Sequence, residues 1–120
     1  MNYIEILQKM EELGITPEVF SGEERNIKNA EYKNASMFLK NELTIEGLGK
    51  IVTVHQVGGY HSLQDGAYGM EWEIVRHFVE HNVYINLGGY YSSYDGLELD
   101  DEGLTEVFPK EKIIVVYESK

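Results

Sequence analysis

Residues 70–91 read MEWEIVRHFVEHNVYINLGGYY, and this stretch decides the fold. In its first ten residues, large apolar side chains alternate with charged or polar ones, which is the period of two expected of a half-buried strand. Residues 80–82 (EHN) fit a tight turn, and a second β-branched run follows them. The stretch therefore predicts an antiparallel hairpin of two strands, 70–79 and 83–91.

Three more runs extend this hairpin into a sheet. Residues 51–57 (IVTVHQV) predict a strand over 50–58, and shorter apolar runs predict strands over 104–108 and 112–118. Pro109 lies between the last two, and proline fits a turn better than a central strand. Strands joined in sequence order by short connections predict an antiparallel meander.

The N-terminal segment carries helical signals instead. Residues 2–13 place four apolar side chains three positions apart, which predicts a helix with one apolar stripe. Gly14 is a favoured residue just beyond a helix end, and Thr16 followed by Pro17 is a typical start of a helical turn. The stripe consists of Ile4, Leu7, Met10 and Leu13.

Residues 23–43 are harder to assign, because four asparagines interrupt their apolar pattern. We interpret 28–42 as a helix and 44–50 (TIEGLGK) as a connector with two glycines. The chain is then a single domain, 1–120, of the α+β class. Its N-terminal helices form a layer over 1–49 and pack on a four- or five-stranded antiparallel β-meander over 50–118.

Charge is the most informative bulk property of the chain. The 21 acidic and 10 basic residues give a net charge of −11. Residues 51–109 hold ten acids and one base, Arg76, and so carry −9 of that charge. Such an acidic body repels nucleic acid and anionic membranes and attracts basic proteins. The alternative is that the acidity serves solubility alone.

Three features that the sequence lacks bear on the cellular location of the protein. The chain has no cysteine, no basic leader followed by an apolar core, and no apolar run close to the roughly 20 residues that span a bilayer. We therefore expect a cytoplasmic protein, without disulfides and without a membrane partner.

Residues 58–66 (GGYHSLQDG) and 88–96 (GGYYSSYDG) share the pattern G-G-Y-x-S-x-x-D-G. In the predicted meander both belong to loops at the same end of the sheet, so Tyr60, Asp65, Tyr90, Tyr94 and Asp95 should be neighbours. Tyrosine and serine are frequent in recognition loops, because tyrosine offers contact area at low entropic cost. The alternative is that two glycine-rich hairpin ends resemble each other by common turn chemistry.

These loops and the acidic run after them give a candidate partner-binding surface. Nearby acids at Glu71, Glu73, Glu80 and Glu106 could add to it. Its proposed members are Tyr60, His61, Asp65, Tyr68, Tyr90, Tyr91, Tyr94, Asp95, Glu98, Asp100, Asp101 and Glu102.

No motif for catalysis, metal binding or cofactor binding is evident. The run DGLELDDEG (95–103) lacks the ligand spacing of an EF-hand loop, and His77 and His81 stand without the partners of a zinc site. The glycines form neither a P-loop nor a dinucleotide fingerprint. We expect no cofactor, no metal and no enzymatic activity.

The segment LGGYYSSYDGLELDD (87–101) and the tail EVFPKEKIIVVYE (106–118) carry a resemblance. They are similar to a family of small, mostly uncharacterised proteins of phages and prophages, with G-Y-Y-S-S-Y-(D/N)-G and E-V-x-P-x-E-x-x-I-x-V-Y-E patterns. The likeness covers about 70–118 and is poor over 15–48. It implies an accessory phage protein, a class that includes inhibitors of host defence such as anti-CRISPR proteins. No catalytic residue follows from it.

Together these observations lead to one function and two alternatives. The first is a non-enzymatic phage-type inhibitor that binds a basic, nucleic-acid-handling host defence protein, with carboxylates in place of phosphates. The alternatives are a toxin-neutralising immunity protein and a binder that sequesters a small molecule or nucleotide in the Tyr/Ser loops. Residues 23–43 are a second candidate surface, and a homo-oligomer stays open.

Overall fold

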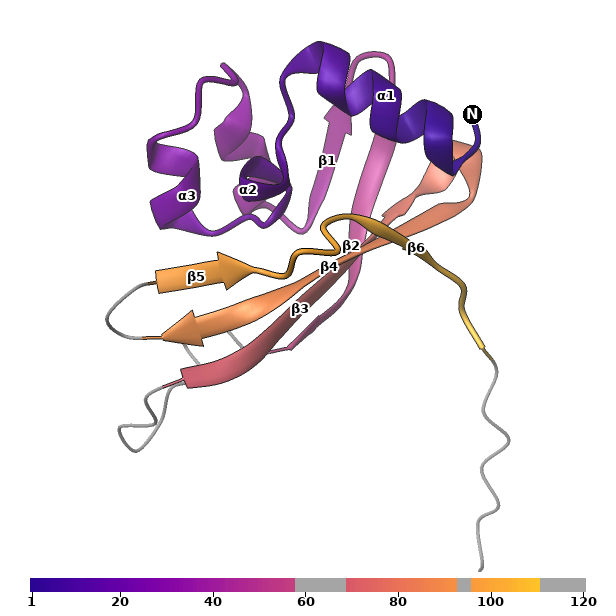
Figure 1. The fold of residues 1–120 in the computed structure, drawn as a ribbon. Helices are drawn as coiled ribbons and strands as arrows, with labels where there is room; N and C mark the ends of the chain where they lie inside the picture. The colour runs from indigo at the N-terminus through magenta and orange to yellow at the C-terminus, as the bar shows by residue number, and fades with distance from the viewer. Residues whose placement is uncertain (58–68, 93–95, 111–120) are drawn as a thin grey trace, which may run out of the picture.

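The computed structural model describes residues 1–57, 69–92 and 96–110, and it shows an α+β fold with the helices on one side of an antiparallel sheet (Figure 1). The helical elements are α1 (Tyr3–Leu13), α2 (Pro17–Phe20), α3 (Glu24–Lys28), η1 (Ala35–Leu39) and η3 (Val79–His81). The strands are β1 (Glu42–Ile45), β2 (Gly49–Val57), β3 (Gly69–Phe78), β4 (Val83–Ser92), β5 (Gly96–Leu99) and β6 (Thr105–Val107).

The sheet is the predicted meander with additions at both edges. Its order is β1-β2-β3-β4-β5, and every pair is antiparallel. β6 also pairs with β4, so β5 and β6 share one side of that strand. The strands expected over 50–58, 70–79, 83–91 and 104–108 correspond to β2, β3, β4 and β6. The strand expected over 112–118 lies outside the described residues.

The helix expected over 28–42 is wrong, and two strands, β1 and β5, were not expected. Residues 28–42 do not form one helix: α3 ends at Lys28, a 3₁₀ turn covers Ala35–Leu39, and β1 begins at Glu42, inside the range expected to be helical. Asparagine competes for backbone hydrogen bonds and so favours turns over helix. β1 was missed because it is only four residues long, although it buries Leu43 and Ile45 in strict alternation.

The helix expected over 2–13 is confirmed as α1. Asn2 caps it, because its side chain accepts from the Glu5 amide while the Glu5 carboxylate accepts from the Asn2 amide. Gly14 ends it at φ +83°. Thr16 caps α2, with Pro17 at its first position.

The predicted stripe of α1 is confirmed in part: Met10 is buried, and Leu7 and Leu13 are partly buried against the core. The fully buried side chains of α1 are Ile6 and Met10, whereas Ile4 is 56% exposed. Residues three apart are 300° apart around a helix, so a stripe at every third position drifts by 60° each step. Ile4 and Leu13 consequently point in opposite directions.

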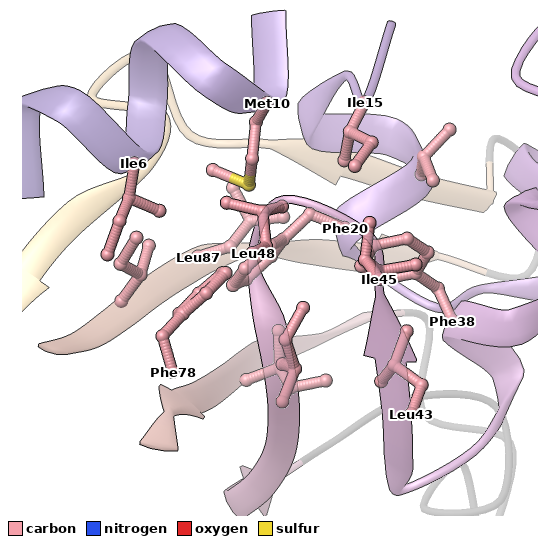
Figure 2. Packing of buried hydrophobic residues seen from close by; sticks show 14 of the residues in the cluster. Ile6, Met10, Ile15, Phe20, Phe38, Leu43, Ile45, Leu48, Phe78 and Leu87 are labelled. Carbon is pink, nitrogen blue, oxygen red and sulfur yellow. The ribbon is translucent and has the colours of Figure 1, made fainter. Parts of the chain in front are cut away.

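The core lies between the helices and one face of the sheet (Figure 2). Ile6 and Met10 of α1 approach Leu48, Phe78 and Leu87 in that space. The aromatic pair Phe20 and Phe78 stacks across the layers, with ring centroids 6.5 Å apart. No helix of the described residues covers the opposite face, which we call the outer face (Figure 1).

Candidate binding surface on the outer face of the sheet

Strand register fixes which side chains share the outer face. Residues opposite each other in an antiparallel pair lie on the same face, and the faces alternate along each strand. Trp72, Ile74 and Phe78 of β3 are buried in the core, so Glu71, Glu73 and His77 belong to the outer face. The outer face comprises Glu42, Thr44, Lys50, Val52, His55, Val57, Glu71, Glu73, Val75, His77, Tyr84, Asn86, Gly88, Tyr90, Glu98, Thr105 and Val107.

Two rows of this face are acidic. In the first, Tyr90 stands between Glu71 of β3 and Glu98 of β5, and its side chain is 50% exposed. In the second, Gly88 stands opposite Glu73, and the Asp100 amide donates to the Gly88 carbonyl over 3.0 Å. Since neighbouring strands are about 4.8 Å apart, the carboxylates surround Tyr90 and Gly88 closely.

A hollow of about 360 Å³ lies within these rows. Gly88 has no side chain at this place, and the Asp100 carboxylate lies over it, so that a Cβ on Gly88 would come within 2.8 Å of Asp100 Oδ2. Asn86 and Trp72 also line the hollow, and Asn86 Oδ1 and Trp72 Nε1 are both shielded from solvent without a hydrogen-bond partner among the described residues. The residues around the hollow are Val57, Glu71, Trp72, Glu73, Asn86, Gly88, Gly89, Tyr90 and Asp100.

The far half of the outer face has a different character. His77 stacks on Tyr84, with ring centroids 4.0 Å apart and planes 3° from parallel. Lys50 lies at this end, and its ammonium is 2.9 Å from the Glu42 carboxylate. Lys50 is therefore already paired with a carboxylate, and it lies away from the hollow.

The acidic run leaves the sheet as a loop between β5 and β6. Leu99 pairs with Gly89 and Thr105 with Asn86, so five residues, 100–104, stand opposite only two on β4. Asp101 and Glu102 are exposed in this excursion, which a turn with Gly103 at φ +65° closes. The loop is an insertion into one edge strand.

The loop is anchored to the helical layer at its end. The Tyr3 hydroxyl of α1 donates to the Leu104 carbonyl over 2.6 Å. Burial, and secondarily the Glu106 carboxylate, raises the pKa of Tyr3, which keeps the phenol protonated as this donor. The anchor fixes the C-terminal end of the loop that carries Asp101 and Glu102.

The one base of residues 51–109 is turned away from this surface. Arg76 is 1% exposed and lies between the rings of Phe20 and Phe38, with its guanidinium carbon 5.4 and 5.2 Å from their centroids. It donates to the Phe20 and Phe38 carbonyls and to the Thr53 hydroxyl. Burial lowers the pKa of Arg76 to about 10, so it stays cationic at neutral pH.

The proposed contact residues separate into three groups. Tyr90, Glu98, Asp100, Asp101 and Glu102 are exposed, on or beside the outer face. We call these five, together with Glu71 and Glu73, the acidic surface.

Tyr91 corrects the prediction for its position. It is 8% exposed and lies on the core face, because β4 continues through residues expected to form a loop, and strand alternation then separates Tyr91 from Tyr90.

The third group lies outside the described residues: Tyr60, His61, Asp65, Tyr68, Tyr94 and Asp95. Gly69 pairs with Ser92, and Ser92 with Gly96, so the strand ends that border residues 58–68 and 93–95 share one end of the sheet. The expected closeness of the two G-G-Y segments stays a prediction.

Sequence reasoning missed the roles of Asn86 and Gly88. The same alternation that predicted the strand would have found them, if continued past Leu87: Asn86, Gly88 and Tyr90 are in phase. The strand expected over 83–91 already included them, but residues 88–96 were also assigned to a loop, so the alternation was not used to assign faces beyond Leu87.

A larger groove, of about 1030 Å³, lies in the helical layer. It is bordered by the end of α1, by α2, α3 and η1, and by β1, and its lining carries charges of both signs. This agrees in place with the second candidate surface, 23–43. Its lining includes Leu13, Val19, Arg25, Asn29, Ala30, Glu31, Tyr32, Lys33, Met37, Thr44 and Glu46.

Comparison of the chain with protein-family models, with curated proteins and with solved structures found no match. Within the described residues, no group of three or more His, Asp or Glu side chains is arranged to hold a metal ion. The helices of the described part are also too short and too polar to cross a membrane.

Proposed function

We propose that the protein is a non-enzymatic, phage-type inhibitor that binds a basic, nucleic-acid-handling host defence protein through the acidic surface. The observation that carries this proposal is the position of Arg76. Because the one base of residues 51–109 is buried among Phe20 and Phe38, no lysine or arginine of the described residues forms an ion pair with Glu71, Glu98 or Asp100.

The chemistry of the surface supports a partner that normally binds phosphates. Carboxylates at strand spacing attract the lysines and arginines that contact a nucleic-acid backbone. Tyr90, half exposed between Glu71 and Glu98, adds the aromatic anchor that charge alone lacks. A toxin-neutralising immunity protein would use the same surface, and the identity of the partner distinguishes the two.

The test compares two variants of equal charge. One neutralises the acidic surface with Glu71→Gln, Glu98→Gln, Asp100→Asn and Asp101→Asn. The control neutralises four exposed acids of the helical side that line neither the hollow nor the helical groove, with Glu5→Gln, Glu11→Gln, Glu12→Gln and Glu24→Gln. Both variants change the net charge by +4, so a difference between them depends on where the neutralised acids lie on the protein.

Two readouts are used. Phage plating on bacteria with and without a defence system measures inhibition, and capture of partners at about 0.05 and 0.5 M salt measures its electrostatic part. We expect the first variant to lose inhibition and capture at least tenfold, roughly the worth of one charged contact, with little change in the control. Equal activity of the two variants would contradict the proposal.

The helical groove favours a second function, the sequestration of a small ligand. Its volume of about 1030 Å³ reaches the upper range of small-molecule sites, and Tyr32 beside Arg25 and Lys33 suits an anionic, ring-containing molecule. Mass spectrometry of the protein purified from bacteria tests this. A retained nucleotide that is lost on Arg25→Gln and Lys33→Gln supports sequestration, and a ligand-free protein argues against it.

A further inference from the structure

We infer that the free edge of β1 is a docking site for one extended segment of a partner protein, which adds to the sheet as a further antiparallel strand. In the described part of the chain, β1 is the first strand of the sheet and pairs with β2 alone. It lies beside the helical layer, and the groove of about 1030 Å³ borders it (Figure 1). This site is separate from the acidic surface, and its occupant is a polypeptide backbone and not the small ligand of the second function.

The hydrogen bonds of β2 show which backbone groups of β1 are free. The Thr53 amide donates to the Asn41 carbonyl over 2.7 Å, so the odd-numbered residues of β1 direct their backbone groups toward β2. The amide of Lys50, opposite Thr44, donates to a carboxylate of η3 over 2.9 Å, which agrees with this phase. Glu42 and Thr44 therefore direct their N–H and C=O groups away from β2, where these groups form no hydrogen bond with the described residues.

Free N–H and C=O groups along a strand edge are complementary to another extended backbone. Glu42 and Thr44 can exchange four hydrogen bonds with one added strand, and this exchange fixes the register of that strand. The two residues are about 6.8 Å apart along the strand, and a peptide repeats its donors and acceptors at the same spacing. An extended peptide is therefore the occupant that matches this edge.

The groove gives the edge of β1 walls that a bare strand edge lacks. Apolar side chains of α1, α2 and η1 line it, among them Leu13, Val19 and Met37. Asn29 and Asn34 line it from the helical layer, and their exposed carboxamides form no hydrogen bond within the described residues. Each carboxamide can donate and accept, so these two side chains can bond the second edge of an inserted backbone.

The arrangement predicts an alternating pattern in the docked segment. Residues opposite each other in an antiparallel pair share a face, so a residue opposite Thr44 directs its side chain to the outer face. The residues on either side of it direct their side chains toward the apolar lining of the groove. Polar and apolar residues should therefore alternate in the segment, and the polar ones should carry the N–H groups that bond β1.

The test selects binding peptides from a library of random heptapeptides on the immobilised protein. Thr44→Pro removes an N–H that points away from β2 and keeps the β1–β2 hydrogen bonds, and proline is tolerated at such a position of an edge strand. Thr44→Val is the matched control, because it keeps the N–H. We expect the selected peptides to bind the wild-type protein and Thr44→Val alike, and Thr44→Pro about tenfold more weakly, the worth of roughly one hydrogen bond. Thermal unfolding checks that both variants fold.

A second measurement leaves the protein unchanged. Methylation of alternate amide nitrogens in one selected peptide gives two versions, one modified at the polar positions and one at the apolar positions. We expect methylation of the polar positions to weaken binding about tenfold or more, because those N–H groups bond β1. Methylation of the apolar positions should have a smaller effect.

Three outcomes would overturn the inference. Peptides that bind Thr44→Pro as tightly as the wild-type protein would show that the edge of β1 is not used, and equal effects of the two methylation patterns would show the same. A wild-type dimer in sedimentation experiments that Thr44→Pro converts to a monomer would identify a second copy of the chain as the occupant. None of these results changes the test of the acidic surface, which depends on phage plating and salt, so the two proposals can fail separately.

Discussion

The two faces of the β3–β4 hairpin carry opposite charges although they belong to the same strands. Arg76 lies on the core face, whereas Glu71 and Glu73 of the same strand lie on the outer face. The buried cation is stabilised by backbone carbonyls and aromatic rings, in place of a carboxylate of the described residues. Glu71 and Glu73 are therefore not needed to neutralise Arg76 and are available to a binding partner. If the core face stabilises the fold and the outer face binds the partner, substitutions on the two faces should have different effects.

The largest effect is expected on the core face. Arg76→Ala removes the link from β3 to α2 and η1, and leaves the Phe20 and Phe38 carbonyls without their donors. We expect the free energy of unfolding to fall by about 3–5 kcal/mol, the combined scale of a cavity and unsatisfied carbonyls. Urea denaturation measures it. A fall below about 1 kcal/mol would show that Arg76 is not the clamp we describe.

The sequence could predict part of the difference between the core face and the outer face, namely the part that depends on local interactions. Alternation in residues 70–79 predicted the strand and even placed Arg76 in phase with Trp72 and Phe78. It could not predict that a charge would be buried there, because the carbonyl acceptors come from residues 20 and 38, far away in the chain. A local sequence pattern shows the period of a strand, but it does not show hydrogen-bond acceptors that come from distant parts of the chain.

The second effect compares adjacent tyrosines. Tyr91 is buried on the core face, so Tyr91→Ala should lower the free energy of unfolding by about 2–4 kcal/mol. Tyr90→Ala removes a ring that is half exposed, and it should cost less than about 1 kcal/mol while weakening partner binding. Thermal unfolding and partner capture measure the two. If Tyr90→Ala destabilises as much as Tyr91→Ala, the assignment of faces is wrong.

The acidic surface was predicted in composition but not in geometry. The exposed acids at 98 and 100–102 were recognised from sequence, whereas the hollow was not. It depends on a five-residue excursion between β5 and β6 that returns to pair with the same strand. A run rich in Asp, Glu and Gly has the composition of a solvated loop, and nothing in it shows that both flanks pair with β4.

The third effect compares adjacent glycines. A Cβ at Gly89 would lie 2.3 Å from the Glu98 carbonyl oxygen, which is backbone of β5 and cannot move alone. Gly89→Ala should therefore cost about 1–3 kcal/mol, as overpacking does, and loosen the β4–β5 pairing. Gly88→Ala meets only the end of the Asp100 side chain and should cost less. Hydrogen exchange of the β5 amides distinguishes them, and equal protection in both variants would contradict the packing.

The smallest effect belongs to the acids of the outer face. Glu71 and Glu98 flank Tyr90 two strands apart, about 9.6 Å, where two charges repel by about 0.4 kcal/mol in water. The double variant Glu71→Gln and Glu98→Gln should stabilise the fold by no more than this at low salt. At about 0.5 M salt the stabilisation should be smaller, because the Debye length is then well below the separation of the two charges. Thermal unfolding at both salt concentrations measures it, with Glu11→Gln and Glu12→Gln as the control. Destabilisation by the outer-face variant would mean that these carboxylates hold the fold, and that the division between a stabilising core face and a binding outer face does not apply to them.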